Sequence, residues 1–234
     1  MKEVITDTTF DDSVIGDTLI LSCNTVRKEL EYAMKTTGIT YPVTYLKSNL
    51  HDIPKVLNAS LQDLIDEASE LGIKRILLAY ATCGNSVAGL HTRNCELILP
   101  RTEDCLRFFF PKGYNGPDVK GGIYYLTYGW LYDEGHGLAY YQQIMDQYGE
   151  ELGQEIYDMM MTNYKYVGLI NTHCYDINEI LPDAKRYAES MKMELLFIDG
   201  DNHYLEQLLT GPYPSDSFLV FEPGHCIAEK ELSL

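Results

Sequence analysis

The sequence predicts an α/β protein with a doubly wound, mostly parallel sheet. Short continuous apolar runs, typical of parallel strands covered on both faces, alternate along the chain with segments of helical apolar spacing. The 234 residues, 45% of them hydrophobic, are enough for one large α/β domain or for two smaller halves. We therefore expect a single domain over residues 1–234, within which two Rossmann-like lobes also fit.

The first βα unit is predicted over residues 14–38. VIGDTLILSC (residues 14–23) contains a short apolar run that predicts a strand. NTVRKELEYAMKTTG follows and predicts a helix that is opened by Asn24 and closed at Gly38.

A second βα unit and two further strands follow. YPVTYLKSN predicts a strand, and residues 55–72 predict a helix that Gly72 stops. Apolar residues share one face of this helix: Leu57, Leu61, Leu64, Ile65 and Ala68. RILLAYA and CELILP are continuous apolar runs and predict the third and fourth strands, so we expect a doubly wound sheet in the N-terminal half.

The pattern changes after Phe110. Residues 111–137 are rich in Tyr and Gly, contain the only Trp, and predict a long ordered excursion, followed by a helix over about residues 138–163. KYVGLIN, ELLFIDG and SFLVFEPG predict three more strands, and DINEILPDAKRYAESMK predicts a helix between the first two. The expected lobes are residues 14–110 and 164–234, with residues 111–163 between them.

Charge and hydropathy narrow the function classes. The formal net charge of −17 disfavours nucleic acid as a partner, because a polyanion would be repelled. The acidic N-terminus lacks the layout of a signal peptide, and no apolar run approaches the ~18 residues of a membrane span. We expect a cytoplasmic protein that does not bind a membrane.

Six cysteines are the main source of candidate chemistry: Cys23, Cys83, Cys95, Cys105, Cys174 and Cys226. They form no CxxC pair, and a disulfide framework is not expected in a reducing compartment. Three roles remain open for each thiol: a small buried apolar group, a metal ligand, or a reactive nucleophile.

The predicted strand ends bring several of these groups to one edge of the sheet. Cys23, His51, Cys83 and Cys105 follow the first four strands, and ligands of open parallel sheets bind at the carboxyl ends of strands. Thiolate and imidazole together suit Zn²⁺ or an iron–sulfur cluster. We expect a metal site there that binds a small polar ligand.

Two polar residues near Cys105 complete this scheme. Arg101 would neutralise anionic charge, and Asp104 would orient a ligand histidine, so both are assigned catalytic roles. The Tyr- and Trp-containing excursion would act as a lid, although a structural hairpin explains it equally well. Each metal candidate also has a structural explanation, such as packing for Cys23 and Cys105 or an exposed turn for His51.

Other residues support alternatives. Cys83 follows a strand and precedes a Gly-led turn, which favours a thiolate nucleophile acting on an amide or ester. CGNSVAG has a weak likeness to a phosphate-cradling loop, with Gly84, Asn85 and Gly89 as its cofactor-binding residues. Further groups are expected at comparable strand ends in the second half: His173, Cys174, Asp201, His203, His225 and Cys226.

Several stretches together resemble the family called domain of unknown function 1638, from about Leu19 to Gly224. Three motifs carry most of the resemblance: YATCGNSVAGL, LILPRTEDCLRFFF and GGIYYLTYGWL. Residues that fall on the motifs or on the early turns of the family are Cys23, His51, Cys83, Gly84, Asn85, Gly89, Leu90, Arg101, Asp104, Cys105, Tyr124, Tyr125, Gly129 and Trp130. Ala81 and Ser86 stand where the family usually has glycine, and Glu103 where it has histidine, which weakens a scheme with an imidazole beside Cys105.

The resemblance also implies a biological setting. Such proteins are associated with anaerobes and methanogens, and with corrinoid-dependent methyltransferases. It implies a metal-dependent transferase in one-carbon metabolism that moves a methyl group or a thiol, with corrinoid methyltransferase components as partners. A non-catalytic metal or cofactor carrier is the third functional class. The apolar FLVFEP and the Tyr-rich stretches leave room for a homodimer interface.

Overall fold

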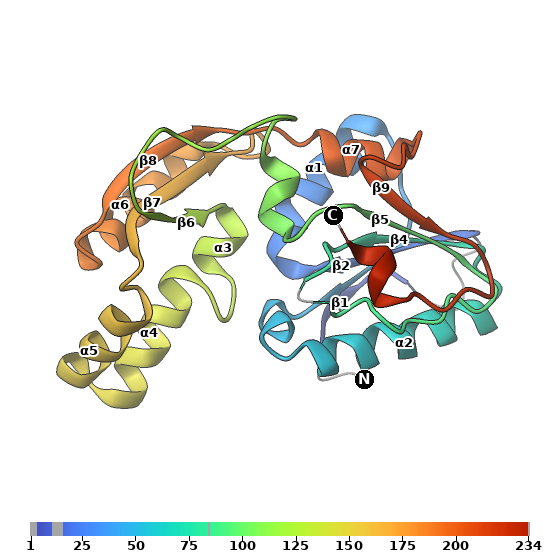
Figure 1. Ribbon diagram of the computed structural model, residues 1–234, viewed down its shortest axis with the longest axis horizontal. Helices are drawn as coiled ribbons and strands as arrows, with labels where there is room; N and C mark the ends of the chain where they lie inside the picture. Colours follow the sequence, from blue (N-terminus) through green and yellow to red (C-terminus); the bar gives the residue numbers. More distant parts are fainter. Residues whose placement is uncertain (1–3, 11–15, 84, 234) are drawn as a thin grey trace. The chain divides into compact units, whose positions relative to one another are not determined.

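The computed structural model describes residues 4–10, 16–83 and 85–233. Two compact units share the chain (Figure 1). Unit 1 consists of Met1–Phe108 and His203–Leu234, and unit 2 consists of Phe109–Asn202. The lobes expected from the sequence divide the chain elsewhere, because its C-terminal part returns to the sheet of the N-terminal part.

Unit 1 contains a six-stranded sheet with the order β1-β3-β2-β4-β5-β9. Its strands are β1 (Ile5–Thr8), β2 (Thr18–Cys23), β3 (Val43–Leu46), β4 (Arg75–Ala79), β5 (Glu96–Pro100) and β9 (Phe218–Phe221). The four strands from β3 to β5 are parallel, whereas the edge strands β1 and β9 run antiparallel to their neighbours. The predicted α/β class with a mostly parallel sheet is confirmed.

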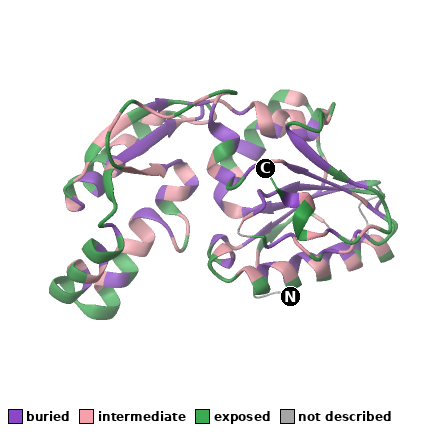
Figure 2. Cartoon of the chain, viewed as in Figure 1, coloured by how far each residue is buried: buried purple, intermediate pink, exposed green. Residues whose placement is uncertain are grey.

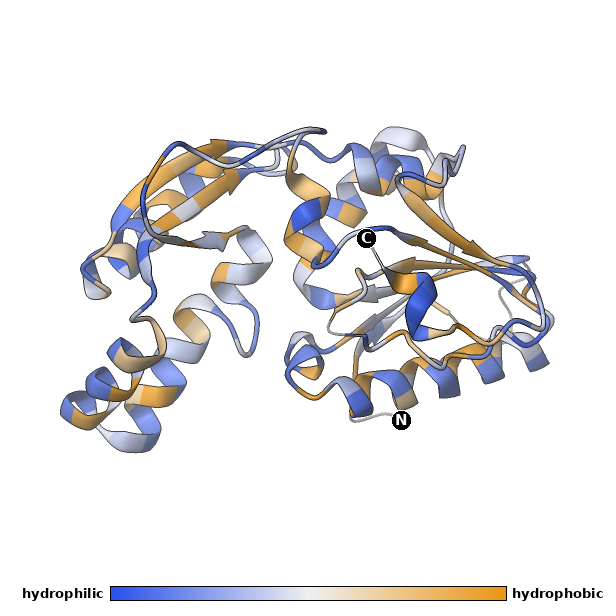
Figure 3. Ribbon diagram, viewed as in Figure 1, coloured by the Kyte–Doolittle hydropathy of each residue, from blue (hydrophilic) through white to orange (hydrophobic). Residues whose placement is uncertain are grey.

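Helices cover both faces of this sheet. They are α1 (Arg27–Thr37), α2 (Pro54–Glu70) and α7 (His203–Thr210), with the short 3-10 helices η1 (Asn24–Val26), η2 (Ser48–Asp52), η3 (Cys105–Phe109) and η4 (Glu229–Leu232). The predicted apolar face of α2 is buried against Leu19, Leu21 and Leu78 of the strands. α1 packs on α7, which contacts β4 and β5. Figures 2 and 3 show the result: inner strands such as β2 and β5 are buried and hydrophobic, and the outer side of α2 is hydrophilic.

The first helix begins later than the sequence predicts. Residues 24–26 form η1, α1 starts at Arg27, and its N-cap residue Val26 makes no side-chain cap hydrogen bond. Gly38 ends α1 in the left-handed conformation, with φ 73°, as predicted. The 3-10 turn is a common way of tightening a helix terminus that no side chain caps.

The direction of β9 corrects one prediction. β9 pairs antiparallel with β5, so that Leu97 lies opposite Phe221 and Pro100 opposite Phe218. The end of β9 therefore lies beside the beginning of β5. For this reason His225 and Cys226 follow the opposite edge of the sheet from the one at which the parallel strands end.

Unit 2 contains a parallel sheet with the order β6-β7-β8. Its elements are β6 (Gly122–Leu126), α3 (Tyr128–Tyr132), α4 (Gly137–Tyr148), α5 (Glu150–Met160), β7 (Tyr164–Asn171), α6 (Ile177–Ser190) and β8 (Glu194–Asp199). Its core joins the helices to β6 and β7 through residues such as Leu126, Tyr157 and Tyr187.

Two predictions for this region are wrong in detail. Residues 111–137 are more than an excursion, because they contain β6 and α3. The helix predicted over about residues 138–163 is two helices, since Gly149 lies between them with φ 80°, which interrupts the helical backbone. The composition of this region, rich in glycine and tyrosine, does not show the periodicity of a strand, and β6 pairs with β7, which is distant along the chain.

Within the described ranges, none of the helices is long and apolar enough to cross a membrane.

Candidate functional site

The carboxyl edge of the unit 1 sheet includes the point at which the strand order reverses. β2 lies between β3 and β4, so the chain leaves β2 toward β3 on one side, and leaves β4 toward β5 on the other. Ligands of open α/β sheets bind at such a switch point, beyond the carboxyl ends of the strands. The residues at the ends of β2 and β4 therefore occupy the ligand-binding position of this fold class.

Cys23 and Tyr80 meet at this switch point. Ser22 pairs with Ala79 in the parallel β2–β4 register, so Cys23 and Tyr80 are the next residues of the two neighbouring strands. Both side chains are buried in the core cluster that includes α2. The Cys23 thiol donates a hydrogen bond to the Thr25 hydroxyl at 3.2 Å.

Backbone pairing between the next two loops brings Cys83 to Cys105. The amide of Thr82 donates to the carbonyl of Thr102 at 3.0 Å, and the amide of Cys83 donates to that of Glu103 at 3.2 Å. The two sulfur atoms lie 3.7 Å apart. Cys105 is buried at the start of η3, whereas Cys83 is partly exposed and has a left-handed backbone with φ 42°.

The electrostatic environment keeps Cys105 protonated when no cation is near. Its contact with Cys83 and its burial raise the pKa of the Cys105 thiol well above its ordinary value. A thiolate at this position would need a positive charge beside it, such as a metal ion. Without one, Cys105 is a poor nucleophile.

Tyr80 adds a polar group that sequence reasoning did not single out. Its side chain is 2% exposed, and its hydroxyl has no hydrogen-bond partner among the described residues. Burial raises the pKa of Tyr80 well above its ordinary value, and Cys23, Cys105 and Cys83 raise it further, which places all three thiols near the hydroxyl. An unsatisfied buried hydroxyl costs about 1–3 kcal/mol.

The three thiols do not form a complete set of metal ligands in the structure. Among residues 4–10, 16–83 and 85–233, no three His, Cys, Asp or Glu side chains lie close enough to hold a metal ion. Cys83 and Cys105 are in contact, while the sulfur of Cys23 is directed to Thr25.

A protein-family model described as "Protein of unknown function (DUF1638)" matches residues 45–209. The chain belongs to the DUF1638 family. The matched range includes Cys83 and Cys105 and begins beyond Cys23. No curated protein and no solved structure matches this DUF1638 chain.

His51 is held by its own turn in the DUF1638 structure. Its Nδ1 atom lies 2.6 Å from the carbonyl of Ser48, and its Nε2 atom lies 3.1 Å from Oδ1 of Asp52. The structure therefore brings Cys83 and Cys105 into contact, but among the described residues neither Cys23 nor the expected imidazole joins them in a group that could hold a metal ion.

Arg101 and Asp104 both form hydrogen bonds to backbone groups of the protein. The Arg101 guanidinium donates to the carbonyls of Ser215 at 3.0 Å and Ser233 at 2.8 Å, which ties the C-terminal segment to the end of β5. The Asp104 carboxylate accepts from the amide of Arg107 at 3.2 Å, and burial raises its pKa. Neither contact involves a ligand histidine.

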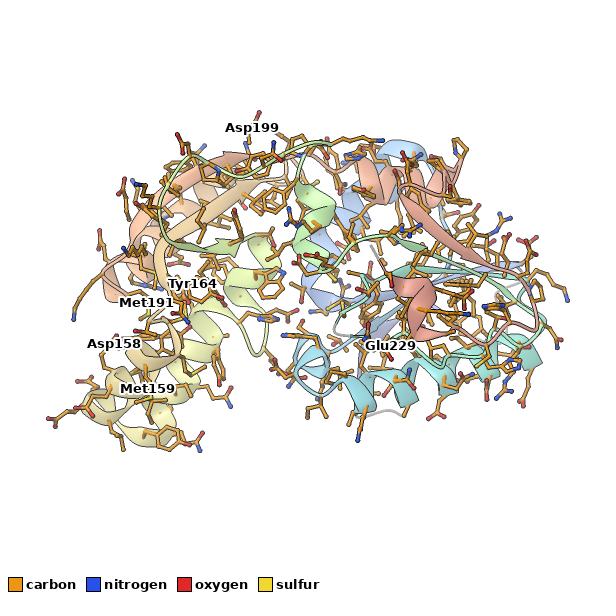
Figure 4. All side chains as sticks on the ribbon, viewed as in Figure 1. Asp158, Met159, Tyr164, Met191, Asp199 and Glu229 are labelled. Atoms are coloured by element: carbon orange, nitrogen blue, oxygen red, sulfur yellow. The ribbon has the colours of Figure 1, made fainter. Side chains whose placement is uncertain are left out.

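The glycine-led turn also anchors the C-terminal segment. Asn85 has φ 67° and donates to Glu229 at 2.8 Å, and the amide of Gly89 donates to Ile227 at 2.8 Å. Figure 4 labels Glu229 on η4. Gly84, the remaining cofactor-binding candidate of this loop, lies outside the described residues.

The Cys and His residues of the second half are distributed over both units. In unit 2, His173 follows β7 and pairs with Asp199 of β8 at 2.8 Å, and the Cys174 thiol donates to the carbonyl of Thr172. Both groups of the ion pair are largely exposed, and Figure 4 labels Asp199 at the end of its strand. In unit 1, His203 begins α7, and His225 pairs with Glu231 at 3.0 Å.

Proposed function

We propose that this DUF1638 protein binds a Zn²⁺ or iron ion through Cys83 and Cys105, with Cys23 as the third thiolate, and is a metalloenzyme with a coordination position for a small polar ligand. The position of these residues at the switch point of the sheet supports the proposal. Their chemistry supports it too, because soft thiolate ligands favour Zn²⁺ and iron–sulfur centres over Mg²⁺ or Ca²⁺.

The separation of the Cys83 and Cys105 sulfur atoms is the observation that carries the proposal. Two thiolates at a Zn–S distance of ~2.3 Å and a tetrahedral angle lie about 3.8 Å apart. The observed separation of 3.7 Å agrees with two ligands of one ion. In a [4Fe–4S] cluster each thiolate binds its own iron, which requires a wider separation, so a single Zn²⁺ or iron, or one iron of a [2Fe–2S] cluster, fits better.

Cys23 is the natural third ligand. It lies at the end of β2, near the same Tyr80 hydroxyl as the other two thiols. Its thiol donates a hydrogen bond to the Thr25 hydroxyl, and another staggered rotamer of Cys23 would direct the sulfur elsewhere. Catalytic zinc sites have three protein ligands and an open fourth position, and three thiolates would leave such a position here.

A bound ion would lower the pKa of a coordinated thiol or water and so produce a nucleophile. The residues of this chain would supply the anionic ligand set and exclude water from its buried side, where Cys23, Tyr80 and Cys105 lie. The methyl or thiol transfer that the family resemblance implies is the reaction class we propose, in the cytoplasm, with corrinoid methyltransferase components as partners.

A catalytic thiol at Cys83 is the second candidate. Its partial exposure and its left-handed backbone, which presents the residue at a turn, favour this role. However, the recorded partner of its sulfur within the described residues is Cys105, not an imidazole or carboxylate that would act as a base.

Metal analysis of protein purified without oxygen tests the first proposal. We expect about one Zn or iron per chain in the wild type, and its loss in the Cys83→Ser and Cys105→Ser variants, because each removes one of the two adjacent ligands. Cys226→Ser is the matched control, since Cys226 is exposed and follows the opposite edge of the sheet.

The same samples separate the two candidates. Wild-type protein that contains no metal, and whose Cys83 is selectively alkylated, would favour the catalytic thiol. Equal metal content in the Cys83→Ser and Cys226→Ser variants would contradict the ligand assignment.

A further inference from the structure

We infer that Cys83 and Cys105 form a redox-active dithiol, which reduces a small-molecule disulfide and closes into a disulfide bond between the two residues. The substrate class is a linear disulfide of low molecular mass, such as oxidised glutathione. This activity needs no metal ion and goes beyond the proposed function. The two sulfur atoms are either joined to each other or available as thiolate ligands, never both.

The two sulfur atoms are close enough to react. They lie 3.7 Å apart between free cysteines, which is van der Waals contact. A disulfide bond is about 2.05 Å long, so the sulfur atoms have to approach each other by about 1.7 Å. Side-chain rotation and a small adjustment of the loops are sufficient for an approach of this size. Cys23 is directed elsewhere, since its thiol donates to the hydroxyl of Thr25.

Backbone pairing keeps these thiols in contact, although they are 22 residues apart along the chain. The amide and the hydroxyl of Thr82 both donate to the carbonyl of Thr102, at 3.0 and 3.2 Å. The amide of Cys83 donates to the carbonyl of Glu103 at 3.2 Å. Attack of Cys105 on a modified Cys83 is therefore intramolecular, and this proximity compensates for the weak nucleophilicity of a buried thiol.

The two cysteines differ in exposure, and this difference assigns their roles. Cys83 is partly exposed and has a left-handed backbone with φ 42°, whereas Cys105 is 6% exposed. Residues other than glycine rarely adopt that conformation, and such strain is typical of functional positions. A disulfide from solution reaches Cys83 first. Cys83 is therefore the attacking thiol, and Cys105 is the resolving thiol.

The reaction consists of two thiol–disulfide exchanges with a substrate RS–SR. Cys83 loses its proton to water, and its sulfur attacks one sulfur of RS–SR. A bond between Cys83 and SR forms, the RS–SR bond breaks, and the released RS⁻ takes up a proton. The sulfur of Cys105 then attacks that of Cys83, loses its own proton and displaces the second RS⁻, which is protonated in turn. The two thiols lose two electrons and two protons, and RS–SR becomes two RSH.

The experiment incubates reduced, full-length protein with oxidised glutathione, without oxygen and after treatment with a chelator. Remaining thiols are alkylated, and tryptic peptides are analysed by mass spectrometry without reduction. Because a Lys or Arg lies between every two successive cysteines, trypsin places each of the six on a different peptide. Peptide 76–93 contains Cys83, and peptide 102–107 contains Cys105.

We expect the wild type to give peptide 76–93 joined to peptide 102–107, lighter by two hydrogens than the two reduced peptides. Two molecules of reduced glutathione should be released for each bond formed, and dithiothreitol should restore both thiols. Cys226 is the internal control, because it is exposed and its sulfur contacts the carbonyl of Gly89 at 3.9 Å. It should stop at the mixed disulfide with glutathione.

Two variants separate the steps. In Cys105→Ser the resolving thiol is missing, so Cys83 should retain glutathione and the joined peptides should be lost. In Cys83→Ser the attacking thiol is missing, and Cys105 should stay unmodified because it is buried. The peptide map of the wild type decides the question even where a variant does not fold.

A wild type whose Cys83 does not react, keeps glutathione or joins a cysteine other than Cys105 would overturn the inference. Each of these results leaves the metal proposal intact, because the chelator-treated protein holds no ion. Protein that is purified without metal but forms the bond between Cys83 and Cys105 would remove the metal proposal and support the dithiol.

Discussion

At the scale of single residues, Tyr80 differs from other buried tyrosines of this protein in the environment of its hydroxyl. The hydroxyls of Tyr157 and Tyr187 lie 2.8 Å apart and satisfy each other within unit 2. The Tyr80 hydroxyl is also buried, but it has no hydrogen-bond partner among the described residues. A buried polar group without a partner destabilises the folded state, and such groups are typical of functional positions, where a bound ligand supplies the missing hydrogen bond.

This contrast predicts opposite effects of the same substitution. Tyr80→Phe should raise the free energy of unfolding of the metal-free protein by about 1 kcal/mol, because it removes an unsatisfied buried hydroxyl. Tyr157→Phe should lower it, since the Tyr187 hydroxyl loses one of its hydrogen-bond partners. Urea unfolding of both variants in the presence of a chelator measures the difference. Destabilisation by Tyr80→Phe would show that its hydroxyl has a partner in the metal-free protein.

At the scale of elements, the polar side of α2 holds the segment that follows the candidate site. The Asn58 amide donates to the carbonyls of Ser86 at 2.7 Å and Ala88 at 2.9 Å. One turn further on, Gln62 donates to the carbonyl of His91 and accepts from its amide. α2 therefore fixes the path of the chain beyond Cys83, in addition to covering one face of the sheet.

The last contact of this series predicts a pH dependence. Asp66 accepts two hydrogen bonds from Arg93, at 2.8 and 3.0 Å, and Arg93 together with Gln62 lowers the pKa of the carboxyl. A carboxyl whose pKa is lowered by folding stabilises the folded state at pH values above its ordinary pKa. This contribution is lost as the pH falls through the pKa of the folded state. Asp66→Asn should therefore unfold at slightly lower urea concentration at pH 7, the effect being small because the pair is exposed.

Urea midpoints of the wild type and Asp66→Asn from pH 7 down to pH 2 measure this difference. It should shrink on acidification and vanish once Asp66 of the wild type is protonated. A difference that stays constant over the whole range would mean that the charge of Asp66 is not its cause.

At the scale of the whole molecule, each unit has a hydrophobic core of its own. The core around α2 is built from residues of the N-terminal strands and the C-terminal segment. The core of unit 2 is built from residues between Tyr124 and Leu195. Unit 2 is therefore a continuous piece of chain that is inserted between β5 and α7 of unit 1.

We expect residues 109–202 to fold when they are expressed alone, because their core needs no residue from outside this range. The isolated unit should show one cooperative thermal transition in far-UV circular dichroism, as small single domains do. A gradual, non-cooperative loss of signal would show that unit 2 depends on unit 1 for its stability.

Local patterns were sufficient for most elements of unit 1. The apolar face of α2, the strands β4 and β5 and the left-handed end of α1 at Gly38 all follow from short-range spacing. β6 could not be predicted in this way, because its partner is β7, and the helices α3, α4 and α5 separate the two strands along the chain. The direction of β9 could not be predicted either, since an apolar run has no preferred direction.

The sequence by itself determined the α/β class, the alternation of helices and strands, and the placement of Cys23, Cys83 and Cys105 at strand ends. Only the tertiary structure decided which strands are neighbours, and with it the contact of Cys83 with Cys105 and the position of the Tyr80 hydroxyl among the thiols. The physical reason is the distance along the chain over which each effect acts. Propensity and periodicity act over a few residues, whereas strand order and side-chain contacts depend on packing between segments that are distant along the chain.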